Sequence, residues 1–213
     1  MLNMSFSIVI ALALLISSSS TNGIEFDYCV ADPTLPHGPF GYPCKDPSKV
    51  TTDDFSYSGL RKPGNTSNAF KFGPNPAFVT QFPGLNGMDI SMVRADIDVG
   101  GAVPIHTHRV AELAILIKGT ILAGFIDTNN TAFYNTMEEG DMFIFPPTLA
   151  HFQVNVGKVP AVAYAAFPST NPGFQGISSS LFKNDLSAEI IQKITLLDPV
   201  QIKKLKAGFG GTN

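Results

Sequence analysis

The sequence predicts an all-β fold, a barrel or sandwich of short strands followed by short α-helices. Seven apolar segments follow one another with strand-like length, at residues 88–97, 112–119, 120–127, 131–137, 141–146, 151–156 and 161–167. The breaks between them carry turn-forming residues such as the Gly pair at 100–101 and the Asn pair at 129–130. The chain is also rich in Gly (19), Pro (16) and Phe (17), a balance that favours strands and turns over a helical bundle.

The N-terminal residues predict secretion. Residues Phe6 to Ile16 form an apolar run that is broken only by Ser7. As a helix this run would rise about 16 Å, well short of the roughly 30 Å of a bilayer core. We therefore expect a signal peptide at residues 1–23. Because no Lys or Arg precedes the run, a buried N-terminal strand or helix is the alternative.

Length and charge limit the remaining possibilities. A chain of 213 residues can form one sizeable core, and we expect a single domain over residues 24–213. Its parts would be an irregular arm at 24–87, the barrel core at 88–168 and a helical region at 180–209. The net charge of −3 argues against a nucleic-acid partner, and no later segment is long enough to cross a membrane.

Cysteines and sequons agree with an extracellular protein. Cys29 and Cys44 flank a turn-rich segment, and an even pair in an oxidising compartment predicts one disulfide. Two unpaired core cysteines are the alternative. Glycosylation sequons begin at Asn65 and Asn129, of which Asn65 lies in the more obvious loop.

The C-terminal region carries helix signals. Asp198 followed by Pro199 predicts an N-cap and a first helical residue. One face of this helix would then carry three apolar residues, Ile202, Leu205 and Phe209, and Gly208 would end it. Residues 187–194 predict a shorter helix, and the basic stretch 203–206 predicts a solvated helix face. Such helices would cover either their own barrel or a neighbouring subunit.

A group of potential metal ligands lies at residues 106–112. In a strand over 105–110, His106 and His108 share one face with Cα atoms about 6.6 Å apart. An extended chain would leave Glu112 too far away, so the chain must turn within residues 109–111. We therefore expect the strand at 112–119 to run back beside the histidine strand and to bring Glu112 to the same point.

The fourth ligand must come from the two remaining histidines. His37 lies in the cysteine-flanked loop and is expected to be exposed, whereas His151 begins an apolar strand. His151 is either a ligand or a satisfied core residue. Three neutral imidazoles and one carboxylate would leave a divalent ion with a charge of +1 and, with six ligands, two open positions. Mn²⁺ or Fe²⁺ suits such a site, although raw affinity favours Cu²⁺ or Zn²⁺.

Two spaced motifs carry a family resemblance. Gly100-x5-His106-x-His108-x3-Glu112-x6-Gly119 resembles the first motif of the cupin superfamily in its germin form, and Gly140-x5-Pro146 with His151-x3-Asn155 resembles the second. Segments such as "QFPGLNG", "LAHFQVNVGK" and "IKKLKAGFGGTN" also look like plant germin-like proteins, including the subgroup described as auxin-binding. The resemblance extends over essentially the whole mature chain.

The resemblance implies a cupin, or jelly-roll, β-barrel with a manganese ion inside. Its ligands would be His106, His108, Glu112 and His151. It also implies a homo-oligomer, a hexamer built as a trimer of dimers through C-terminal helices, and a location in the extracellular space, the apoplast and cell wall.

Two departures from the family pattern bear on the activity. Thr148 stands where the second motif usually has Gly. Val93 and Val103 stand where oxalate-oxidising germins carry asparagines that hold the substrate. Valine offers oxalate no hydrogen bond, and each lost polar partner costs about 1–3 kcal/mol, so we do not expect oxalate oxidation.

Two functional hypotheses follow for the site. The first is an enzyme, a manganese-dependent superoxide dismutase acting on a small oxygen species and serving plant defence or development. The second is a protein without turnover, in which the ion stabilises the barrel or anchors a small carboxylate such as an auxin. The apolar valines are compatible with both hypotheses.

Overall fold

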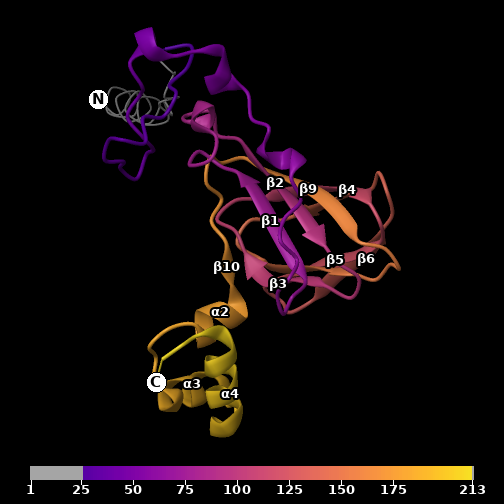
Figure 1. Ribbon diagram of the computed structural model, residues 1–213. Helices are drawn as coiled ribbons and strands as arrows, with labels where there is room; N and C mark the ends of the chain where they lie inside the picture. The colour runs from indigo at the N-terminus through magenta and orange to yellow at the C-terminus, as the bar shows by residue number, and fades with distance from the viewer. Residues whose placement is uncertain (1–25, 213) are drawn as a thin grey trace, which may run out of the picture.

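Two antiparallel five-stranded sheets face each other and enclose the core (Figure 1). The computed structural model describes residues 26–212, so the expected signal peptide lies outside the described residues. The first sheet has the order β1 (Phe72–Ala77), β2 (Ser91–Ile97), β9 (Ala161–Phe167), β4 (Glu112–Lys118) and β7 (Met142–Phe145). The second has the order β10 (Gln175–Gly176), β3 (Ala102–Thr107), β8 (Ala150–Asn155), β5 (Ile121–Ile126) and β6 (Ala132–Met137).

Alternation along the strands builds the interior. On β9, Ala161, Ala163, Ala165 and Phe167 are buried and the residues between them are half-buried. This period of two turns every second side chain toward the opposite sheet. The predicted all-β barrel is confirmed, and all seven predicted strands are present within one or a few residues of their expected bounds.

Strand β1 was not predicted. It lies within residues 24–87, which the sequence predicted to be irregular, and it pairs with β2 along its whole length. Pro74 and Pro76 conceal it, because proline cannot donate to a ladder and argues against a strand. Both prolines are tolerated because β1 is an edge strand of its sheet.

The N-terminal arm contains short 3₁₀ helices and the disulfide. The helices are η1 (Pro47–Lys49), η2 (Thr52–Phe55), η3 (Gly59–Arg61) and η4 (Pro83–Leu85). Cys29 and Cys44 are bonded, which confirms the predicted pair. The side chain of Asn86 holds the disulfide loop, because its amide donates to the carbonyl of Tyr42 over 2.9 Å.

Three helices follow the barrel and extend from one end of it instead of lying over a sheet (Figure 1). They are α2 (Ile177–Phe182), α3 (Ala188–Thr195) and α4 (Pro199–Phe209), packed around a small core of Phe182, Ile191 and Ile202. The predicted cap of α4 at Asp198 is present, and Ser187 caps α3. The predicted end of α4 is wrong: the helix continues through Gly208 to Gly210, which has a φ of 79°.

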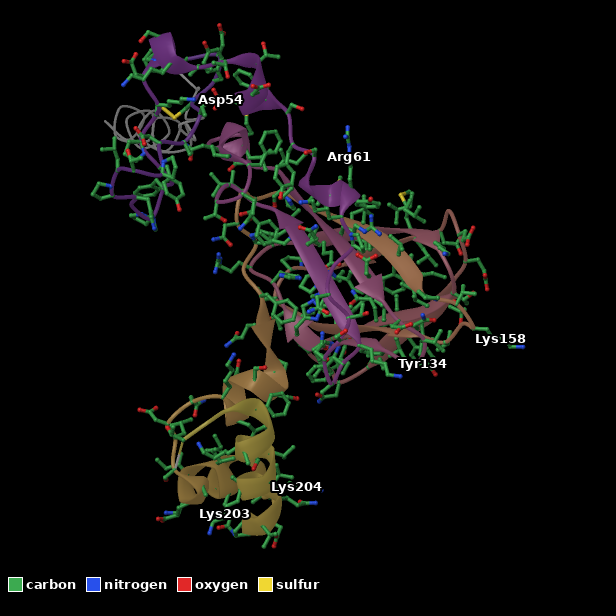
Figure 2. All side chains as sticks on the ribbon, in the orientation of Figure 1. Asp54, Arg61, Tyr134, Lys158, Lys203 and Lys204 are labelled. Carbon is green, nitrogen blue, oxygen red and sulfur yellow. A yellow bond between two sulfur atoms is a disulfide. The ribbon has the colours of Figure 1, made fainter. Side chains whose placement is uncertain are left out.

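The basic stretch 203–206 is only partly solvated, contrary to the prediction. Lys203 and Lys204 project from α4 into solvent (Figure 2). Lys206 is only 2% exposed, and its ammonium donates to the carbonyls of Asn184 and Leu186 over 2.9 and 2.7 Å. Lys206 therefore joins α4 to the loop between α2 and α3. Within residues 26–212, no helix has the length and apolar character that a membrane crossing requires.

Candidate metal centre

The four predicted ligands meet inside the barrel. His106 comes from β3, His108 from the residue after β3 ends, Glu112 from the first residue of β4 and His151 from β8. The chain bends at Arg109 and Val110, as the spacing required. The predicted convergence of the four side chains is confirmed, and their binding of a metal stays a prediction.

The predicted pairing of the two strands is wrong. β4 does not run beside β3, because β4 pairs with β7 and β9 in the first sheet, whereas β3 pairs with β8 and β10 in the second. Glu112 therefore reaches the histidines across the barrel interior, from the opposite sheet. The true neighbour of the histidine strand is β8, on which His151 lies directly opposite His106.

The ligand atoms form a compact buried group. One nitrogen from each histidine and one carboxylate oxygen all lie within 4.8 Å of one another. The four residues are between 1% and 7% exposed. The Nε2 atoms of His106 and His108 are 3.2 Å apart, and Glu112 Oε2 lies 3.0 Å from His108 Nε2 and 3.3 Å from His151 Nε2.

Backbone carbonyls fix the orientation of all three imidazoles. The Nδ1 atoms of His106 and His151 each lie 2.8 Å from a carbonyl two residues earlier, that of Pro104 or Leu149. His108 Nδ1 contacts the carbonyl of Gly173. A carbonyl only accepts, so each Nδ1 carries the hydrogen and each neutral ring directs an Nε2 lone pair inward. Such outer partners hold metal-binding histidines in position.

This arrangement fits a metal ion. With hydrogens on both Nδ1 atoms, His106 and His108 direct two lone pairs at each other and have no proton to share between their Nε2 atoms. A divalent cation at the centre would accept these lone pairs together with those of His151 and Glu112. A bound cation would therefore explain why two Nε2 atoms that both carry lone pairs lie only 3.2 Å apart.

The site also keeps its ligands in the metal-binding protonation states. Burial, followed by the neighbouring His151 and His108, lowers the pKa of His106 from 6.5 to about 3. Burial alone would raise the pKa of Glu112, but the close approach of His108 and His151 outweighs burial and lowers that pKa to about 2. A neutral imidazole and an ionised carboxylate are the forms that bind metals.

Thr148 supports the site at a backbone cost. Its φ is 66°, in the left-handed region that a β-branched residue rarely adopts. Its N–H donates to the carbonyl of His108 over 3.0 Å. The turn thus keeps the conformation that glycine would favour, although the sequence departs from the family pattern here.

An apolar cavity of about 180 Å³ adjoins three of the four predicted ligands. His106, His108 and Glu112 line one end of it, and Val93 and Val103 are part of the apolar remainder of its wall. Gln153 is the only other polar residue in the lining. Gln153 is 5% exposed, and its Oε1 has no hydrogen-bond partner within residues 26–212.

The remaining predicted residues lie outside the site. His37 is exposed in the disulfide loop, where its ring packs 4.7 Å from that of Tyr42. Asn65 and Asn129 are exposed in loops, and their glycosylation stays a prediction.

Sequence reasoning missed two residues of the cavity. Gln153 has a usable signal, because it lies two positions after His151 on the same strand and therefore faces the same side. Phe174 has none: it precedes the two-residue strand β10 in an irregular segment, yet its ring stacks on His106 with centroids 4.4 Å apart. The folded chain places both Gln153 and Phe174 in the wall of the cavity.

Comparisons with known proteins agree with this geometry. The Cupin family model matches residues 58–203. The chain is 52% identical to auxin-binding protein ABP20 of Prunus persica, over 99% of this chain and 98% of that one. It is 46% identical to germin-like protein subfamily 3 member 3 of Arabidopsis thaliana, over 93% and 94% of the two chains.

Solved structures give the same result. An oxalate oxidase structure matches with a TM-score of 0.84 and 32% identity, over 88% of this chain and 98% of that chain. A second structure, of oxalate oxidase with the substrate analogue glycolate, matches equally well. With the converging histidines and glutamate, these comparisons show that the chain belongs to the cupin family, among the germin-like and auxin-binding proteins.

Proposed function

We propose that this chain is a secreted manganese protein that dismutates superoxide. The observation that carries the proposal is the convergence of three Nε2 lone pairs and one carboxylate, all within 4.8 Å, in a buried site. Manganese is the ion that the resemblance to germins implies, and imidazole with carboxylate is a donor set that suits it.

The protein residues would hold the ion and control its surroundings. His106, His108, His151 and Glu112 would supply four ligands, and with six-fold coordination two positions stay open for a small ligand. A bound manganese ion would supply one-electron redox chemistry. One carboxylate against a divalent ion leaves a net charge of +1, which attracts a small anion into a cavity with an apolar wall.

The same cavity argues against oxalate as the substrate. Val93 and Val103 contribute only methyl groups to its wall, so a dianion would leave water without replacement hydrogen bonds on those sides. Gln153 alone offers a polar group beyond the ligands. We therefore propose that this chain does not oxidise oxalate, although it shares its fold with oxalate oxidases.

A second candidate is binding of an auxin-like aromatic acid without turnover. Two features favour it: the apolar wall of the cavity suits an aromatic ring, and the unpartnered Oε1 of Gln153 can accept a hydrogen bond from a ring N–H. Three relatives from Prunus persica are named auxin-binding proteins. In this case the carboxylate would bind the ion.

Several features support an extracellular oligomer. The Cys29–Cys44 disulfide is typical of an oxidising compartment, and Asn65 and Asn129 are exposed, as glycan attachment requires. The C-terminal helices present large apolar side chains to solvent, of which Leu196 is 90% exposed. We propose that they bury this surface in a homo-hexamer, a trimer of dimers, in the apoplast or cell wall.

A paired assay tests the proposed activity. Superoxide dismutation is measured on the native protein, after chelation, and after manganese is restored. We expect activity to follow manganese content, and His106→Ala to abolish it. His37→Ala is the matched control, because His37 is exposed and lies outside the site. Equal activity in the stripped sample would exclude the proposal.

The second candidate has its own measurement. Calorimetric titration of the manganese-loaded protein with indole-acetic acid should give a saturable heat if the cavity binds aromatic acids. Absence of heat at millimolar ligand would leave dismutation as the only candidate.

A further inference from the structure

The barrel is open along one side, between the free edges of the two sheets. β1 is the edge strand of the first sheet and β10 that of the second. Hydrogen bonds close the two ends of this side: the N–H of Ala102 donates to the Phe70 carbonyl over 2.9 Å, and that of Val79 to the Thr170 carbonyl over 3.0 Å. Between them, β1 pairs only with β2 among the described residues. We call this gap the slit.

Two prolines keep the slit from closing. Pro74 and Pro76 lie two residues apart on β1, so both face the same side of the strand. Neither has a backbone N–H, so neither can donate a hydrogen bond to a further strand. Their side chains line the cavity beside the ligands. The side chains of Asn68 and Tyr57 donate to the carbonyls of Phe72 and Pro76 on β1. Pro74, between these two contacts, is exposed, so β1 is open to solvent at this residue.

Phe174 lies on the other side of the slit. Of the residues that line the cavity, only Pro74 and Phe174 are exposed. Phe174 also lines an outer pocket that includes Thr107, His108 and Arg109. His108 borders both spaces as well, and the exposed ring of Phe174 covers one face of His106.

The backbone on the N-terminal side of Phe174 is fixed. Arg109 donates to two neighbouring carbonyls, through its N–H to Pro172 over 3.0 Å and through its guanidinium to Asn171 over 2.9 Å. The carbonyl of Gly173 is held by His108 Nδ1. Gly173 has a φ of 70°, in the left-handed region that favours glycine, so the backbone before Phe174 keeps this conformation without strain.

The ring of Phe174 is held much less firmly. One face stacks on His106 at 4.4 Å with an interplanar angle of 19°, a second contact is edge-on to His108 at 5.9 Å, and the side chain is 54% exposed. Exposed side chains change rotamer on the picosecond to nanosecond timescale. A fixed backbone with a loosely packed ring can therefore open and close the slit without moving a metal ligand.

We propose that Phe174 determines which ligands reach the metal centre, acting as a size filter at the slit. Small oxygen species and triatomic anions pass the ring in its stacked position, whereas bulkier anions require it to rotate away from His106. This inference rests on the proposed metal function. It assigns substrate selection to a residue that does not bind the ion.

The test compares two probes on manganese-loaded protein. Azide is the small probe, and its dissociation constant is measured by electron paramagnetic resonance. Pyridine-2,6-dicarboxylate is the bulky probe, and the second-order rate at which it removes manganese is measured by stopped flow. Metal content is determined first, so a protein that never binds manganese disproves the proposed function and not the filter.

Four variants give graded expectations. Phe174→Ala should raise the removal rate about tenfold or more, since a steric barrier is lost, while the azide constant stays within about twofold. Phe174→Leu should lie between Ala and the parent, and Phe174→Trp should slow removal. Phe133→Ala is the matched control, because Phe133 is 48% exposed and stacks on a ring at 5.3 Å but lines neither cavity.

Three outcomes would overturn the inference. One is a removal rate in Phe174→Ala that equals those of the parent and Phe133→Ala. Another is an equal change for azide and the bulky chelator, which would show that the ring only positions His106. The third is loss of manganese from Phe174→Ala while Phe174→Leu retains it with the parent removal rate.

Discussion

The two ends of the barrel cavity differ in what they contribute. At the ligand end each imidazole is oriented by a backbone carbonyl, and the four donor atoms converge. At the other end Val93 and Val103 belong to an apolar wall in which Gln153 is the one polar side chain. One end therefore has the donor atoms that an ion requires, and the other would limit what can bind to that ion.

This difference separates the question of which ion the site fits from the question of which substrate it accepts, whereas a family resemblance implies an answer to both. Oxalate oxidase structures share the fold at a TM-score of 0.84, and a common ligand end does not require a common substrate. In a cavity this small, two valines are enough to remove most polar partners for a dianion. The ligand end and the apolar end can therefore be altered independently.

The largest effect should come from the ligand end. Glu112→Gln keeps the shape of the side chain but removes the only negative charge among the four predicted ligands. Manganese affinity should therefore fall by at least about 100-fold. Calorimetric titration measures this. Glu189→Gln is the control, because Glu189 is exposed on α3 and pairs only with Lys193. Binding of Glu112→Gln with the affinity of the parent would show that the carboxylate is not a ligand.

The apolar end should respond differently. Replacing Val93 and Val103 together by Asn buries two amides, and we expect the free energy of unfolding to fall by about 2–4 kcal/mol. Oxalate should then stabilise the manganese-loaded double variant but not the parent. Denaturant unfolding with and without oxalate measures both effects.

The control for the valine pair is Val99→Asn, since Val99 is 41% exposed in a turn. It should change stability little and gain no response to oxalate. If oxalate stabilised the parent as strongly as the double variant, the apolar end would not select against it.

The smallest effect should come from the turn beneath His108. Thr148→Gly removes a left-handed β-branched residue, which costs roughly 1–2 kcal/mol in that region, and should raise the free energy of unfolding by about 1 kcal/mol. Thr80→Gly is the control, because Thr80 is an exposed turn residue without a positive φ. It should lose stability, since glycine adds chain entropy to the unfolded state. A stability loss in Thr148→Gly would contradict the account of this turn.

Local sequence patterns predicted much of the fold, but they did not predict which strands pair or which distant residues come into contact. Alternation and turn residues identified seven strands, and Asp198 with Pro199 identified the start of α4. The partner of β4 was predicted wrongly. The alternation of side chains along a strand shows which of them share a face, but it does not show which sheet the strand joins. Lys206 was assigned to solvent because its acceptors, the carbonyls of Asn184 and Leu186, belong to a distant loop.

The candidate site shows the same division. Spacing and the turn at residues 109–111 brought His106, His108 and Glu112 together, and the resemblance to the second cupin motif indicated His151 as the fourth ligand. Gln153 could have been found by its parity with His151. Phe174 could not, because its place over His106 depends on the hydrogen bonds that hold residues 171–173 against Arg109 and His108.

The most direct test of the central claim is the metal content of the native protein, measured by mass spectrometry after exhaustive dialysis against metal-free buffer. The converging ligands predict one ion per chain, and the resemblance to germins predicts that this ion is manganese. A native protein that carries no stoichiometric manganese, whether it holds another metal or none, would contradict the claim.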